Sequence, residues 1–276
     1  MLSIITINYN NKEGLERTIK SVCSQSYEKF EYIIIDGASN DGSLDVINSY
    51  KKDIDYFVSE KDHGVYNAMN KGIKKSKGDY LLFLNSGDTL INKDVLAVVG
   101  KQINSKVGLY YGNINLVYKD SERLKIYPDE LTFNFFYESS LPHPATFIQR
   151  KLFDTVFYYN EDYRIVSDWE FFICAICKYE VSYCYLDKVI SNYDMSGISS
   201  SEENKSLIEQ EKNSVYETHF KWFYEDYLAL KSFKRTFLNK RSKALLELEK
   251  YKITKSINSI SLFSLGIALR IIRKLK

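Results

Sequence analysis

The sequence predicts an α/β protein whose mostly parallel sheet is flanked by helices and followed by a helical C-terminal extension. Strand and helix patterns alternate through the first half of the 276-residue chain, an arrangement that produces parallel sheets covered on both faces. Several apolar strands end in short polar tracts, and beyond about residue 202 the hydrophobic spacing is helical. Hydrophobic residues make up 45% and charged residues 27% of the chain, so we expect a globular rather than a disordered protein.

Each expected element follows from hydrophobic spacing. Short apolar, β-branched runs predict strands, and apolar residues that recur every three or four positions predict helices. The expected strands cover residues 2–8, 30–35, 54–59, 80–84 and 181–186, with further β-rich segments at 107–118 and 145–149. The expected helices cover 12–24, 41–50, 65–75 and 168–179, with Asp41 as the candidate N-cap of the second.

Polar tracts follow three of these strands. They are Asn8-Tyr9-Asn10, Asp36-Gly37-Ala38-Ser39 and Asn85-Ser86-Gly87-Asp88. Ligands of such sheets bind outside the carboxyl ends of the strands, so we expect the tracts to share one rim. Asp36 and Asp41 have the chemistry to accept hydrogen bonds from a nucleobase or ribose, and Asp88 has the chemistry to hold Mg²⁺ or Mn²⁺. Taken alone, Asp36 and Asp41 are also ordinary turn residues, so both interpretations stay open for them.

Five motifs, in this order, resemble those of the family 2 glycosyltransferases. They are IITINYN (4–10), SQSY (24–27), IDGASNDGS (35–43), DHGVYNAMNKG (62–72) and GDYLLFLNSGD (78–88). The resemblance extends more loosely to about residue 195 and is strongest to the branch that builds bacterial exopolysaccharide, capsule and O-antigen. It implies a GT-A fold, which is Rossmann-like, and an inverting enzyme that moves a sugar from a nucleotide diphosphate sugar to a glycan.

The resemblance places donor binding in the first half of the chain. It assigns Thr6, Asn8 and Asp36 to the nucleoside and places residues 85–88 at the family's metal motif. The further candidates for binding the nucleotide sugar are Asn70, Lys71, Asn85 and Ser86. For Lys71, a solvated position on a helix is an equal alternative. The family commonly offers three carboxylates in its metal motif, whereas this chain offers Asp88 alone. Its Mn²⁺ or Mg²⁺ would therefore depend on diphosphate oxygens and bind weakly without the nucleotide.

The acceptor side is predicted from the segment VSDWE (166–170) and from a proline-flanked histidine. The resemblance assigns the catalytic base to Asp168; a helix N-cap is the structural alternative. Glu170 is a second candidate base, and Trp169 either stacks on a sugar or packs in the core. His143, between two prolines, is a candidate acceptor contact or a structural loop residue.

Charge divides the chain unequally. Residues 231–276 carry 13 Lys and Arg against two Asp and Glu, whereas residues 1–230 carry 25 basic and 34 acidic residues. The acidic body argues against nucleic-acid binding, and the basic, amphipathic segment 233–276 predicts attachment to an anionic membrane surface. Packing of that segment on protein is the alternative. We therefore expect a catalytic domain at 1–200, with donor and acceptor halves at 1–105 and 106–200, and a basic helical extension at 201–276.

Cellular location is predicted from the cysteines and the first residues. The chain begins in a strand pattern without a signal-peptide pattern, and Cys174-x-x-Cys177 has no second cysteine pair at metal-ligand spacing. We expect a reducing cytoplasmic location, peripheral on the inner face of the plasma membrane, with buried rather than metal-binding cysteines.

The favoured hypothesis is an enzyme that transfers a hexose from UDP to a glycan on polyprenyl diphosphate. A nucleotidyltransferase is an alternative, but it prefers a Gly-rich basic loop after the first strand, where this chain has YNNKE (9–13). A degenerate GT-A protein that binds glycan or organises an assembly is another. The reduced acidic motif supports that alternative, and the retained Asp88 and Asp168 weigh against it.

Overall fold

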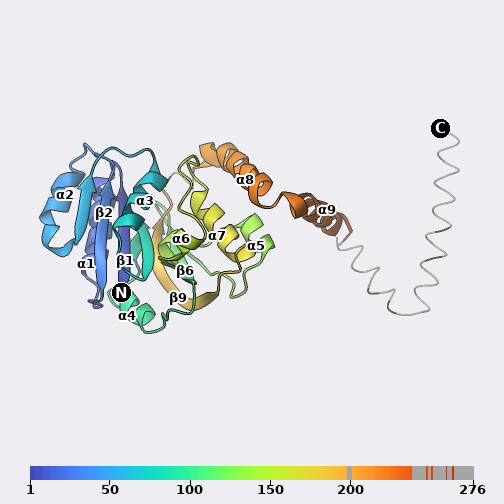
Figure 1. The fold of residues 1–276 in the computed structure, drawn as a ribbon, viewed down its shortest axis with the longest axis horizontal. Coiled ribbons are helices and arrows are strands. Elements are labelled where there is room, and N and C mark those ends of the chain that lie inside the picture. The colour runs from blue at the N-terminus through green and yellow to red at the C-terminus, as the bar shows by residue number, and fades with distance from the viewer. Residues whose placement is uncertain (198–200, 238–246, 248–249, 251–258, 260–262, 264–276) are drawn as a thin grey trace. The chain divides into compact units, whose positions relative to one another are not determined.

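The computed structural model describes residues 1–197, 201–237, 247, 250, 259 and 263 (Figure 1). The chain forms two compact units, Met1–Val215 and Tyr216–Lys276. In the described part of the chain, no helix has the length and apolar character needed to cross a lipid bilayer. The predicted membrane-binding segment, 233–276, falls mostly outside the described residues.

One sheet of nine strands forms the centre of the first unit within the described residues. The strands are β1 (Leu2–Asn8), β2 (Phe30–Asp36), β3 (Tyr56–Ser59), β4 (Tyr80–Asn85), β5 (Thr89–Leu90), β6 (Leu109–Val117), β7 (Glu122–Lys125), β8 (Thr146–Gln149) and β9 (Tyr183–Asp194). Their order is β3-β2-β1-β4-β8-β6-β9-β5, and β7 pairs with β6. Strands β1 to β4 are mutually parallel where they pair, whereas β8 runs antiparallel to β4 and β6. The mixed α/β fold that the sequence predicts is confirmed.

The described residues also form helices. They are α1 (Lys12–Cys23), α2 (Ser43–Ser49), α3 (Val65–Lys75), α4 (Val95–Gly100), α5 (Phe133–Glu138), α6 (Leu152–Thr155), α7 (Ser167–Cys177), α8 (Lys205–His219) and α9 (Lys221–Phe237). Short 3₁₀ turns occur at Lys51–Asp53, His143–Ala145 and Glu202–Asn204. Both α1 and α3 contact β1, and all seven residues of β1 are buried, so both faces of this strand are covered.

The start of α2 corrects one prediction. The helix begins at Ser43, after Gly42, whose φ of 91° lies in the left-handed region. Asp41 therefore precedes the N-cap position, and its carboxylate accepts the backbone N–H groups of Ser43 (3.0 Å) and Lys12 (2.7 Å). The left-handed turn at Gly42 delays the helix and leaves Asp41 to join the starts of α1 and α2.

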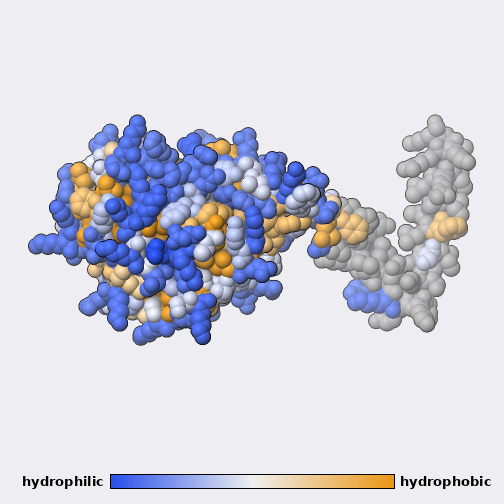
Figure 2. Space-filling model, in the orientation of Figure 1, coloured by the Kyte–Doolittle hydropathy of each residue, from blue (hydrophilic) through white to orange (hydrophobic). Residues whose placement is uncertain are grey.

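The second half of the sheet departs furthest from the predicted pattern. Strand β9 runs to Asp194, well beyond the predicted end at residue 186, because pairing with β6 and β5 continues past the charged pair Asp187-Lys188. On α9, which belongs to the second unit, apolar side chains are exposed, Trp222 by 92% and Phe233 by 56%. Figure 2 shows hydrophilic residues over most of the visible face of the first unit, broken by small hydrophobic areas.

Candidate active site

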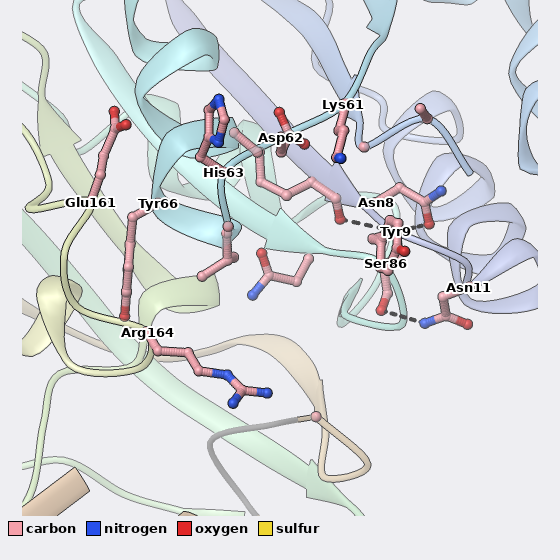
Figure 3. Close-up of a pocket in the computed structure, with 18 of the residues that line it drawn as sticks. Asn8, Tyr9, Asn11, Lys61, Asp62, His63, Tyr66, Ser86, Glu161 and Arg164 are labelled. Carbon is pink, nitrogen blue, oxygen red and sulfur yellow. Dashed lines mark hydrogen bonds between the residues drawn. The ribbon is translucent and has the colours of Figure 1, made fainter. Parts of the chain in front are cut away.

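The polar tracts after β1, β2 and β4 meet at one edge of the sheet, as the sequence predicts. Asn8 is in register with Asp36, and Ile7 with Asn85. A cavity of about 740 Å³ opens at this edge (Figure 3). Its wall is completed by the turn that begins α3 and by the loop before α7.

A closed hydrogen-bond network shapes the sheet side of this first cavity. Asn8 donates to Asp36 Oδ1 (2.6 Å) and Ser39 Oγ (3.1 Å), and Ser86 Oγ donates to Asn8 Oδ1 (2.7 Å). Asp36 is fully buried and also accepts the Ser39 N–H, the Ser39 hydroxyl and the Ser59 hydroxyl. Asn8 and Ser86 line the cavity and Asp36 does not; Asp36 orients Asn8, which accepts the hydrogen bond of Ser86.

Three other residues that were expected to bind the nucleotide sugar do not line the cavity. The Thr6 side chain is buried and lies 3.0 Å from a tyrosine hydroxyl in the core. Asn70 is buried and donates to Glu161 Oε1 (2.8 Å). Lys71 pairs with Asp62 (2.7 Å) and with a second carboxylate of the same loop. Asn70 and Lys71 thus hold two loops whose residues Glu161 and Asp62 do line the cavity.

Two oxygen-bearing side chains at the edge of the sheet, Asn85 and Asp88, have the chemistry to bind a divalent cation. Asn85 Oδ1 is buried and has no hydrogen-bond partner among the residues that the structure describes. Burial raises the pKa of Asp88 to about 7, although the N–H groups of Asp194 and Asn85 oppose this rise. A cation would satisfy the first oxygen and stabilise the ionised form of the second, so each group has the chemistry of a ligand for Mg²⁺ or Mn²⁺.

The protein supplies few further ligands for such an ion. Within the described ranges, no group of three or more His, Cys, Asp or Glu side chains is placed to hold a metal. Asp88 lines neither cavity, whereas Asn85 lines the first cavity and a second one beside it. Phosphate oxygens of a bound nucleotide would have to complete the coordination.

The second cavity, of about 390 Å³, adjoins the first. Four residues line both cavities: Val65, Tyr66, Asn85 and Arg164. Figure 3 shows the guanidinium group of Arg164 extending into the space between Tyr66 and the side of the cavity formed by Ser86 and Asn11. That guanidinium makes no hydrogen bond or ion pair within the described part of the chain.

Asp168 lines the second cavity and is held at its rim. Helix α7 begins at Ser167 after Val166 in the N-cap position, so Asp168 is not the N-cap. Its Oδ1 lies 2.8 Å from the Tyr66 hydroxyl, and its Oδ2 lies 3.8 Å from His143 Nδ1. Burial, with the added charge of Asp168, raises the pKa of Tyr66 well above its ordinary value. The tyrosine therefore keeps its proton and donates a hydrogen bond to the carboxylate.

The other acceptor-side candidates divide between the cavity and the core. His143 lines the cavity, and burial lowers its pKa despite the opposing charge of Asp168, so its imidazole is neutral at pH 7. Trp169 also lines the cavity and donates its indole N–H to the Phe136 carbonyl (2.8 Å). Glu170 is buried and lines neither cavity.

Sequence reasoning missed the residues that hold and surround Asp168. Glu211 on α8 accepts the consecutive backbone N–H groups of Arg164 (2.7 Å), Ile165 (3.0 Å) and Val166 (3.2 Å). Lys212 on the same helix lines the second cavity. No periodic pattern marks the loop before α7, and α8 lies beyond the motifs, so the sequence alone gave no signal for these contacts.

Comparison with known proteins identifies the family. A model of glycosyl transferase family 2 matches residues 3–165. The chain belongs to glycosyl transferase family 2. One relative is an uncharacterized glycosyltransferase of Mycobacterium tuberculosis (strain CDC 1551 / Oshkosh), 34% identical over 213 residues that cover 75% of this chain and 79% of the relative. Another is a PGL/p-HBAD biosynthesis glycosyltransferase of Mycobacterium bovis (strain BCG / Pasteur 1173P2), 30% identical over 221 residues that cover 76% of this chain and 83% of the relative.

Solved structures confirm the fold of this glycosyltransferase. The crystal structure of Staphylococcus aureus TarS in complex with UDP matches with a TM-score of 0.58 and 20% identity. The match covers 70% of this chain and 60% of the TarS chain. At this identity the likeness shows the fold, which is GT-A, as the sequence resemblance implied.

Proposed function

We propose that this glycosyltransferase inverts configuration as it moves a hexose from a UDP-hexose to a hydroxyl of a glycan acceptor. One observation carries the proposal: the donor-sized first cavity and the second cavity join at Tyr66, Asn85 and Arg164, and Asp168 lines the second cavity beside Tyr66. In this arrangement the donor occupies the first cavity and the acceptor the second, so their reacting atoms meet at the junction.

Donor binding follows from the groups around the first cavity. Tyr9 is 71% exposed at the cavity wall and offers a ring face on which a nucleobase can stack. Asn8 and Ser86 present oriented polar groups to the ribose and phosphates. The guanidinium of Arg164 and the ammonium of Lys61 balance the charge of the departing diphosphate.

Asp168 acts as the general base. The acceptor hydroxyl attacks the anomeric carbon on the face opposite the diphosphate, its proton passes to Asp168, and the bond to the diphosphate breaks. A single displacement of this kind inverts configuration. Tyr66 fixes the carboxylate by hydrogen bonding, and the neutral His143 beside it adds no positive charge that would weaken the base.

A divalent cation and a membrane-linked acceptor are further parts of the proposal. Mn²⁺ or Mg²⁺, held by Asn85, Asp88 and diphosphate oxygens, would supply charge neutralisation of the leaving group. The acceptor that we propose is a glycan on polyprenyl diphosphate, in surface polysaccharide synthesis such as that of capsule or O-antigen. The basic segment 233–276 supports it, because such a segment is attracted to the anionic cytoplasmic face of a membrane.

The Asp168→Asn variant tests the base. Loss of the proton acceptor should lower the rate of sugar transfer by about a thousandfold, while the affinity for UDP changes less than about twofold. Transfer is measured as UDP release from a panel of nucleotide sugars, and UDP affinity by calorimetry. Asp187→Asn, at an exposed position on β9, is the matched control. A fully active Asp168→Asn enzyme would remove the base assignment, and a wild-type protein that binds no UDP would contradict the transferase proposal.

A further inference from the structure

The second cavity has more positive than negative side chains in its wall. Lys125, Arg164 and Lys212 line it, against the single carboxylate of Asp168. Arg164 also lines the first cavity and serves the donor there. Lys125 and Lys212 are therefore the two positively charged side chains that line the second cavity and not the first.

Lys212 is half-buried and lies against an aromatic ring. Its Nζ lies 4.6 Å from the centre of the Trp169 ring. Burial lowers the pKa of Lys212, although the charge of Asp168 opposes the change. No ion pair to this ammonium occurs among the residues that are described.

Lys125 reaches the same cavity from the end of β7. Its Nζ lies 4.8 Å from the centre of the Tyr127 ring and 3.3 Å from Ser139 Oγ. Burial, with the added charge of Arg123, lowers the pKa of Lys125. In the described chain this ammonium, too, has no carboxylate partner.

A third polar group lines the same cavity. Ser140 lines the cavity, and its buried hydroxyl has no hydrogen-bond partner in the described part of the structure. Withdrawing ammonium groups from water without an anion is unfavourable, and an unsatisfied buried hydroxyl adds to the cost. An anionic ligand would pair with both lysines and accept the hydrogen bond of Ser140.

We propose that the acceptor carries an anionic group, a phosphate or a carboxylate, which binds Lys125, Lys212 and Ser140 while the reacting hydroxyl lies at Asp168. The inference rests on the proposed function and names the chemical class of its acceptor. The buried side chains Tyr127 and Trp169 also line the cavity, and because the two ammonium groups lie over their rings, they support the lysines.

The fluorescence of Trp169, in the cavity wall, provides a direct signal for ligand binding. The chain has two tryptophans, so Trp222→Phe leaves Trp169 as the single one, and Trp222 is 92% exposed. This variant, saturated with UDP to fill the first cavity, is titrated with methyl glucoside, methyl glucuronide and glucose 1-phosphate. One anionic probe should bind at least about tenfold more tightly than the neutral glucoside. Preference for the phosphate points to a phosphate-linked acceptor, and preference for the glucuronide points to an acidic sugar.

Substitution of both lysines completes the test. Lys125→Met with Lys212→Met should abolish the preference for the anion while changing UDP affinity less than about twofold. Lys188→Met, an exposed lysine on β9, should retain the preference. Equal or undetectable binding of all three probes, or a preference that survives in the double variant, would overturn the inference. Failure of the wild type to bind UDP is a separate result and counts against the proposed function instead.

Discussion

The two cavities differ in how their polar side chains are paired. Around the first, Asn8 and Asp36 belong to a network in which Asp36 accepts hydrogen bonds from three different side chains. In the second, Lys125 and Lys212 are partly buried and have no carboxylate partner within the described residues. The first cavity is therefore shaped before a ligand arrives, whereas the second keeps its charges for the ligand. Changes at the first should affect stability, and changes at the second should affect turnover.

The largest effect is expected at Asp88, on the donor side. Its pKa, about 7 in the folded protein against an ordinary value of 3.8, favours the protonated form. The protonated carboxyl therefore contributes its full stabilisation of the folded protein below pH 4. This contribution is lost as the pH rises through 7. Relative to Asp88→Asn, the wild type should therefore lose up to about 4 kcal/mol in free energy of unfolding between pH 4 and pH 8.5.

Urea unfolding at a series of pH values measures this loss. Asp120→Asn, at an exposed site, should show no such change relative to the wild type. Added Mn²⁺ with UDP at pH 8.5 should stabilise the wild type more than Asp88→Asn. Parallel stability curves for the wild type and Asp88→Asn would show that the carboxyl is not desolvated as described.

Arg164→Met should separate turnover from stability. The guanidinium has no partner to lose in the described structure, so the free energy of unfolding should change by less than about 1 kcal/mol. Removing its charge from the departing diphosphate should slow transfer by about a hundredfold. Chemical unfolding and UDP release measure the two effects, with the exposed Arg123→Met as control. A large loss of stability with normal turnover would invert the proposed difference between the cavities.

The smallest effect is expected at Glu211, which positions the loop before α7. Glu211→Gln retains one acceptor oxygen for three backbone N–H groups, so the protein should lose about 1–2 kcal/mol of stability. Displacement of Asp168 should lower kcat several-fold, and UDP affinity should change less than kcat. Steady-state kinetics and calorimetry check this, with Glu209→Gln, exposed on the same helix, as control. Normal kcat in Glu211→Gln would mean that the loop is held by other contacts.

Several details near the motifs depended on the tertiary structure. The sequence indicated polar tracts at strand ends, but Thr6 points into the core, and Asn70 and Lys71 hold neighbouring loops. An alternating pattern shows that a side chain lies at a strand end or on a helix. It does not show whether the nearest partner will be a ligand or another part of the chain, because that depends on packing.

The sequence by itself determined the parallel half of the sheet and the family, because hydrophobic spacing and turn residues such as those at 36–43 act over a few neighbouring positions. Only the tertiary structure decided which groups surround Asp168. Tyr66 comes from α3, Arg164 from a loop without periodicity, and Lys212 from a helix outside the motifs. Their meeting depends on how distant segments pack, and no local pattern encodes such contacts.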